Sequence, residues 1–171
     1  MVSIRPEKPN DYQHIYNINK LAFKGEVEAK LVNNLRKTKG FIPELSIVAI
    51  KNGEVVGHIL FSVIHIQTNS KSIPVLALAP MAVLPKHQKQ GIGSRLVREG
   101  LIKCKELGYK AVILVGHPNY YPRFGFTPAK EIGLELPFDA PSEAFMAYEI
   151  IPQALEGTKG MVVYPPEFAE E

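Results

Sequence analysis

The sequence is poor in cysteine and has no tryptophan. Cys104 is the only cysteine in the chain, which excludes an internal disulfide and gives no support to a cysteine-based metal site. Because Cys104 falls on the apolar side of a predicted helix, we expect a buried structural thiol there and not a nucleophile.

Long hydrophobic runs and a strong charge of either sign are also missing. No apolar run approaches the ~18 residues of a membrane span, and the N-terminal MVSIRPEKPNDY lacks the apolar segment of a signal peptide. The 20 Lys and Arg residues barely outnumber the 17 Asp and Glu residues, so the net charge of +3 gives no argument for nucleic acid. We expect a cytoplasmic protein that binds neither membranes nor nucleic acid.

The composition that remains is typical of a globular domain, with 46% hydrophobic and 22% charged residues. A chain of 171 residues corresponds to a single domain, 1–171, at about 150 residues per domain. We expect its core at about 2–151 and a C-terminal surface extension at 152–171, which wraps the surface and ends in a frayed tail.

Hydrophobic periodicity predicts two helices near the N-terminus, after a short strand at 2–5. Asn10 or Asp11 is positioned to cap the first helix, which runs to about residue 23. The second helix is expected at 26–37.

The rest of the pattern predicts a sheet that begins antiparallel and then turns parallel. Asn52-Gly53 is a strong hairpin signal between strands at 45–51 and 54–67. A third strand, a helix, a buried strand and a closing strand follow at 73–84, 90–107, 111–115 and 144–151. The predicted fold class is α/β: a single mixed, mostly antiparallel sheet with helices on both faces.

A glycine-bearing bend, PKHQKQGIGSRLV, opens the helix at 90–107. The first N–H groups of a helix are unpaired and carry a partial positive charge, so a helix N-terminus attracts phosphate. Gly91 and Gly93 allow the backbone to approach an anion closely, and Lys86, Lys89 and Arg95 add positive charge around it. The bend therefore predicts a pyrophosphate site.

Two familiar nucleotide motifs do not explain this bend. Leu96 stands where the dinucleotide-binding pattern G-x-G-x-x-G requires its third glycine. The loop pattern G-x-x-x-x-G-K-[ST] of nucleoside triphosphatases occurs nowhere in the chain.

Two motifs in order resemble the signatures of the GNAT superfamily of coenzyme A-dependent N-acetyltransferases. QKQGIG at 88–93 matches the family's Q/R-x-x-G-x-G/A after a strand, and YPRFGF at 121–126 is similar to its Tyr-x-x-x-Gly-Phe. NYYPRFGF at 119–126 and VYPP at 163–166 resemble the YhbS-like branch of that superfamily. The resemblance covers about residues 2–151 and implies a GNAT-like acyl-CoA N-acyltransferase fold, so that 1–171 would be one acetyltransferase domain.

The resemblance implies acetyl-CoA as the cofactor. Pro80 lies inside a predicted strand, where proline marks an edge or a bulge, and we favour the bulge that the family places there. The freed N–H groups near Ala82 or Val83 would then polarise the thioester carbonyl. The implied contacts to the cofactor are Met81, Ala82, Val83, Gln88, Lys89, Gln90, Gly91, Ile92, Gly93, Ser94, Arg95, Asn119 and Tyr121.

Tyr121 is the candidate general acid, because the resemblance gives it the role of protonating the departing thiolate. A tyrosine with a pKa near ~10 stays protonated at neutral pH. The neighbouring Tyr120 is an alternative donor.

The general base is not specified. Residues 75–79 read VLALA, with no carboxylate where many relatives carry a glutamate. His117 and Glu28 are our candidate catalytic residues for this role. His58, expected as a satisfied and half-buried histidine, His65, and a water chain without a dedicated base remain open.

The implied reaction is direct transfer of an acetyl group from acetyl-CoA to a primary amine of a small molecule or peptide, within a ternary complex. A non-catalytic acyl-CoA-binding sensor and the transfer of another acyl group remain open. A homodimer would be in keeping with the family, and the acceptor is not specified by the sequence.

Overall fold

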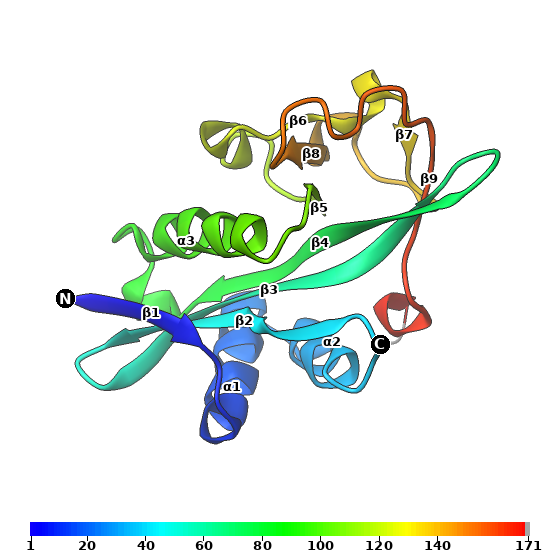
Figure 1. The fold of residues 1–171 in the computed structure, drawn as a ribbon. Helices are drawn as coiled ribbons and strands as arrows, with labels where there is room; N and C mark the ends of the chain where they lie inside the picture. The colour runs from blue at the N-terminus through cyan, green and yellow to red at the C-terminus, as the bar shows by residue number, and fades with distance from the viewer. Residues whose placement is uncertain (170–171) are drawn as a thin grey trace.

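The computed structural model describes residues 1–169, and strands with near-continuous buried stretches build the antiparallel half of its sheet (Figure 1). Strands β2 (Phe41–Lys51) and β3 (Glu54–Gln67) form the predicted hairpin across Asn52, whose φ of 51° fits a tight turn. β1 (Val2–Pro6) pairs with β2, and β4 (Ser72–Val83) pairs with β3, all antiparallel.

Three α-helices cover the two faces of this sheet. α1 (Tyr12–Phe23) and α2 (Val27–Leu35) lie on one face, and α3 (Ile92–Glu106) lies on the other (Figure 1). The expected capping of α1 is wrong in detail, because neither candidate side chain caps it. The Asp11 carboxylate instead accepts hydrogen bonds from the Arg5 guanidinium, the shorter at 2.6 Å, and from the Lys8 amide.

The second half of the sheet begins with β5 (Ala111–Val115), the strand that pairs with β4 in parallel. β5 follows the α3 crossover, and β8 (Phe145–Glu149) and β6 (Thr127–Pro128) extend the sheet antiparallel. The resulting order is β1-β2-β3-β4-β5-β8-β6. The predicted mixed, mostly antiparallel sheet with helices on both faces is therefore confirmed.

The C-terminal segment departs from the expected surface wrap. β9 (Gly160–Val163) pairs antiparallel with β3 at 65–67, beyond the part of β3 that β2 occupies, and pairs in parallel with β7 (Leu134–Glu135). Leu155 and Val162 are buried, so the segment contributes to the core. The predicted frayed end at residues 170–171 lies outside the described residues.

Close packing fixes α3 against the sheet. The Gly100 backbone lies so near the Phe61 ring that a Cβ atom at this position would be 2.5 Å from Cε1 of Phe61. Cys104 is fully buried on the same helix, and burial raises the pKa of its thiol to about 12. Cys104 is therefore an inert structural thiol, as expected.

A buried polar chain joins the α2 end to the middle of the sheet. Arg36, just after α2, forms an ion pair with Glu7 at 2.9 Å, and the Ser46 hydroxyl donates to Glu7 at 2.5 Å. Ser46 in turn contacts Nε2 of His58 at 2.9 Å. His58 is fully buried, not half-buried as expected, and its Nδ1 has no partner in residues 1–169.

Candidate active site

Strands β4 and β5 separate soon after they meet. Their pairing is limited to Leu76 with Val112 and Ala77 with Ile113, although β4 continues to Val83. Ala79 and Pro80 form a bulge opposite β3, because the register shifts between the pairs Ile59–Met81 and Phe61–Leu78. The bulge predicted from Pro80 is therefore present, and β4 is left with one unpaired edge beside a gap.

The unpaired edge of β4 presents particular backbone groups to this gap. The Leu84 N–H donates to the Val56 carbonyl at 2.9 Å and so faces the β3 side. The Val83 carbonyl faces the other way and accepts a hydrogen bond from the Gln88 amide at 3.0 Å. Because the N–H and C=O of one strand residue point to the same edge, the amide of Val83 faces the gap, and that of Ala82 faces β3.

The glycine bend shapes the N-terminus of α3. Gly91 is the N-cap residue with a φ of 84°, and Lys89 two residues earlier has a φ of 64°. No side chain caps the helix, so the amides of its first turn remain available to a ligand. Their partial positive charge and the adjacent Lys89 ammonium favour an anion.

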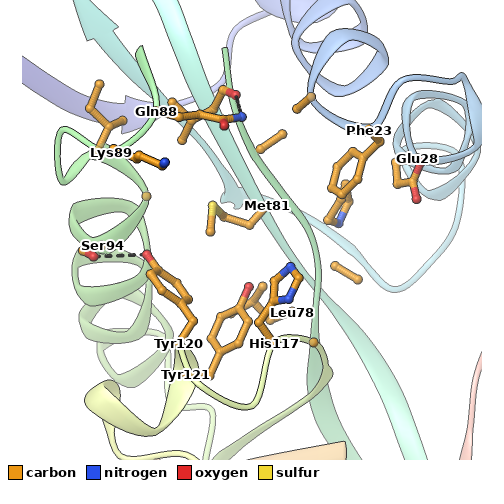
Figure 2. Close-up of a pocket in the computed structure, with 18 of the residues that line it drawn as sticks. Phe23, Glu28, Leu78, Met81, Gln88, Lys89, Ser94, His117, Tyr120 and Tyr121 are labelled. Carbon is orange, nitrogen blue, oxygen red and sulfur yellow. Dashed lines mark hydrogen bonds between the residues drawn. The ribbon is translucent and has the colours of Figure 1, made fainter. Parts of the chain in front are cut away.

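These elements surround one cavity of about 930 Å³ (Figure 2). The bend and the start of α3 form one wall, the free edge of β4 forms the floor, and residues of α1 and α2 face them. Of the expected cofactor and catalytic residues, those that line the cavity are Glu28, Met81, Ala82, Val83, Gln88, Lys89, Gly91, Ile92, Gly93, Ser94, His117 and Tyr121.

Two adjacent tyrosines occupy the end of the cavity that lies beyond β5. Tyr121 begins the 3-10 helix η3 (Tyr121–Phe124), and its hydroxyl points toward the middle of the cavity below Met81 (Figure 2). That hydroxyl has no hydrogen-bond partner in residues 1–169, and burial raises the pKa of Tyr121 to about 12. The Tyr120 hydroxyl, in contrast, is bound to the Ser94 hydroxyl at 3.1 Å.

The candidate bases differ in position. His117, exposed just after β5, and half-buried Glu28 at the start of α2 lie on facing walls of the cavity (Figure 2). His58 is sealed in the core, where burial lowers its pKa to about 3, and His65 is exposed on β3 away from the cavity. The structure thus brings His117 and Glu28 to the site and removes His58 and His65.

Three expected cofactor residues do not line the cavity. The Arg95 guanidinium is held by Glu99 at 2.7 Å and by the Val2 carbonyl, which turns it toward β1. The Gln90 side chain accepts a hydrogen bond from Lys51 at 2.9 Å. Asn119 is exposed outside the cavity, so the cofactor contacts of these three residues stay predictions.

Several lining residues were not expected. Arg123 stacks on the Tyr120 ring, with its guanidinium carbon 4.6 Å from the ring centroid, and donates to the Tyr120 carbonyl at 2.9 Å. Phe23 contributes an aromatic wall from the end of α1 and is 42% exposed. The one sequence signal for Phe23 as a cavity residue is an aromatic ring that does not lie on the predicted buried face of its helix.

Comparison with known proteins agrees with the fold. Residues 3–129 match the family model described as an acetyltransferase (GNAT) domain. The chain is 34% identical over 165 residues to the uncharacterized N-acetyltransferase YhbS of Escherichia coli strain K12, and the match covers 96% of this chain and 97% of YhbS.

Two solved structures have the same fold. The crystal structure of E. coli YhbS in complex with CoA is 34% identical, has a TM-score of 0.91, and covers 99% of this chain and 92% of that one. A GNAT family acetyltransferase from Brucella melitensis in complex with acetyl-CoA is 31% identical, with a TM-score of 0.80 and 98% coverage of both chains. The chain therefore belongs to the GNAT family of N-acetyltransferases.

Proposed function

We propose that the protein transfers an acetyl group from acetyl-CoA directly to a primary amine, within a complex that holds both substrates. One observation carries this proposal. A single cavity brings together the uncapped amides of α3, the gap-facing amide of Val83 and the unpaired hydroxyl of Tyr121. These groups match the three needs of acyl transfer from a thioester, which are donor binding, carbonyl polarisation and protonation of the leaving group.

The residues present fit a coenzyme A thioester. A Cβ atom on Gly93 would lie 3.3 Å from Cε of Met81 and 3.2 Å from the Tyr120 hydroxyl, so a larger residue here would crowd this wall of the cavity. The amides of α3 and Lys89 would hold the diphosphate, and the free edge of β4 from Met81 to Val83 would hold the pantetheine amides. Relatives bound to CoA and to acetyl-CoA support this assignment.

Acetyl-CoA, when bound, supplies an acetyl group activated as a thioester. The Val83 N–H would donate a hydrogen bond to the thioester oxygen. Of the two expected donors, we favour Val83 over Ala82 because the Val83 amide faces the gap and the Ala82 amide faces β3. A single donor of this kind contributes about 3–4 kcal/mol of transition-state stabilisation in another enzyme.

Tyr121 acts as the general acid. In the transfer, the bond from the acceptor nitrogen to the carbonyl carbon forms, the carbon–sulfur bond breaks, and the sulfur takes the Tyr121 proton. Because the Tyr121 pKa is about 12 and a thiol has a pKa near ~8.5, proton transfer from Tyr121 to the free thiolate after it has departed would be uphill by about 5 kcal/mol. The proton must therefore move together with the breaking bond.

His117 and Glu28 are the two groups that could remove a proton from the incoming amine. Both line the cavity, and residues 75–79 of β4 carry no carboxylate. An alkylamine with a pKa near ~10.4 arrives protonated, so a base or a water chain must receive this proton before attack.

A screen of primary amines with acetyl-CoA, measured by release of free thiol between pH 6 and 9, tests the proposed function. We expect release that depends on the amine and is abolished without it. A kcat/KM that rises with pH in the wild type and loses this rise in His117→Gln would identify His117 as the base. If the protein binds acetyl-CoA but none of the amines causes release of free thiol, the proposal is contradicted. If thiol release is faster from propionyl-CoA than from acetyl-CoA, the transferred group is propionyl and not acetyl.

A further inference from the structure

A second cavity of about 850 Å³ adjoins the first and differs from it in chemistry. Three aromatic rings form its outer wall in series: Phe138 lies 5.8 Å from Tyr164, which lies 5.0 Å from Phe168, measured between ring centroids. Aliphatic side chains of β4, β5 and β9 complete the wall. Among the described residues that line this cavity, none carries a charge.

The polar groups of the second cavity are few and mostly occupied. The Gln67 side-chain amide donates to the carbonyls of Thr68 and Lys71, at 2.9 and 3.2 Å, within its own turn. The Tyr164 side chain is half-buried, and desolvation raises the pKa of its hydroxyl to about 12, so the hydroxyl stays neutral at physiological pH. The cavity therefore offers an uncharged, aromatic-rich surface of the size that holds a small organic molecule.

The two cavities meet where β4 and β5 separate. Leu78, Ala79 and Val115 line both of them. The second cavity also reaches solvent independently, because Phe138 and Val163 on its wall are 50% and 48% exposed. A molecule can therefore enter it without passing the α3 wall of the first cavity.

We propose that the second cavity binds the body of the acceptor, and that the acceptor is a primary amine with an uncharged aromatic or alkyl body. This inference rests on the proposed function. The amine end would lie at the shared junction, near His117 and Tyr121 of the first cavity, and the apolar body would lie against the aromatic wall. A polyamine or a free amino acid would bring a second charge into a space with no charged partner, which is strongly unfavourable.

The separate opening favours the acceptor over a long acyl chain as the occupant. Direct transfer requires acceptor and donor to be bound together, and a cavity with its own access to solvent permits the acceptor to enter with the donor in place. An acyl chain would arrive from the thioester side and would need no second opening.

Equilibrium binding separates this inference from catalysis. We would titrate phenethylamine and spermidine into CoA-saturated protein by calorimetry, with wild type, Phe138→Glu and Ile102→Glu. Phe138 lies in a loop, and Ile102 is 58% exposed on α3, outside both cavities, so Ile102→Glu is the matched control. We expect phenethylamine to bind, spermidine not to bind, and Phe138→Glu alone to weaken phenethylamine by at least about tenfold, which is about 1.4 kcal/mol.

Each other outcome overturns a specific statement. Turnover of spermidine without binding of phenethylamine would overturn the inference and leave the proposed function standing. Phenethylamine binding with no thiol release from acetyl-CoA would contradict the proposed function and keep the apolar site. If Phe138→Glu weakens octanoyl-CoA and not the amine, the cavity holds an acyl chain. If Phe138→Glu instead dissociates a dimer in sedimentation, the cavity holds a second copy of the chain.

Discussion

Replacing Tyr121 with phenylalanine isolates one hydroxyl group in the cavity. The phenylalanine ring keeps the aromatic packing, in which the Tyr121 centroid lies 5.1 Å from that of Tyr120 and 5.7 Å from that of Phe126. The lost hydroxyl has no hydrogen-bond partner in residues 1–169, so its removal leaves no protein group unsatisfied. Tyr121→Phe should therefore leave the melting temperature nearly unchanged.

The expected effect on the rate follows from the position of the Tyr121 pKa. General acid catalysis contributes about 10²–10⁴-fold, and an acid whose pKa lies far from the working pH gives the smaller values. Since burial raises the pKa of Tyr121 to about 12, we expect Tyr121→Phe to lower kcat by about 100-fold, or about 2.7 kcal/mol. The wild-type rate should show no loss from Tyr121 ionisation until the pH nears that value.

Tyr120→Phe is the matched control for this prediction. It removes a hydroxyl that is bound to Ser94 at 3.1 Å and leaves Tyr121 in place, so we expect a loss smaller than about tenfold. Free-thiol release at saturating acetyl-CoA measures both variants, and calorimetry with CoA checks that donor binding is unchanged. A wild-type rate in Tyr121→Phe, or a larger loss in Tyr120→Phe, would refute the role assigned to Tyr121.

Three further predictions concern stability. His58 takes up a proton below pH 6.5 in the unfolded state but only near pH 3 in the folded state, because burial lowers its pKa. Lowering the pH from 6.5 to 3 should therefore reduce the free energy of unfolding of the wild type by up to about 5 kcal/mol. In urea unfolding, His58→Gln should lack this contribution to the pH dependence. Arg36→Ala leaves the Glu7 carboxylate buried without its cation and should lower the free energy of unfolding in urea by about 3–5 kcal/mol. Arg95→Ala removes one partner of an exposed ion pair and should lower it by less than about 1 kcal/mol. Gly100→Ala places a methyl group against the Phe61 ring and should lower the free energy of unfolding by about 1–3 kcal/mol, measured by thermal unfolding. A Cβ atom at Gly25 meets nothing within 4 Å, so an equal loss in Gly25→Ala would contradict this packing argument.

The sequence predicted the strands that are specified by neighbouring residues, such as a turn motif or a short apolar run. The Asn-Gly turn and the apolar run after it place β3 at Glu54–Gln67, and a short continuous apolar segment places β5 at Ala111–Val115, both with the predicted bounds. Pro80 alone indicated an edge or a bulge, because proline cannot donate to a strand ladder, and the resemblance to the GNAT superfamily selected the bulge that the structure contains.

Elements that depend on distant partners were not predictable in the same way. β9 has only four residues, and its pairing with β3 and β7 comes from segments far away in the chain. Arg95 follows the bend directly, yet its side chain is directed by the Val2 carbonyl and by Glu99. Such contacts form only once distant segments of the chain come together in the fold, so composition and periodicity do not predict them.

The binding of coenzyme A at the start of α3 is the central claim, and a matched pair of glycine variants tests it most directly. Gly91 and Gly108 have φ angles of 84° and 91°, each has open space around a Cβ atom, and they lie at opposite ends of α3. Asp in this backbone conformation has a similar cost at both sites, but only Gly91→Asp sets a carboxylate beside the amides that would hold the diphosphate. Calorimetric titration with CoA should show Gly91→Asp weakened by at least about tenfold and Gly108→Asp unchanged. Equal affinity in the wild type and both variants would contradict the claim.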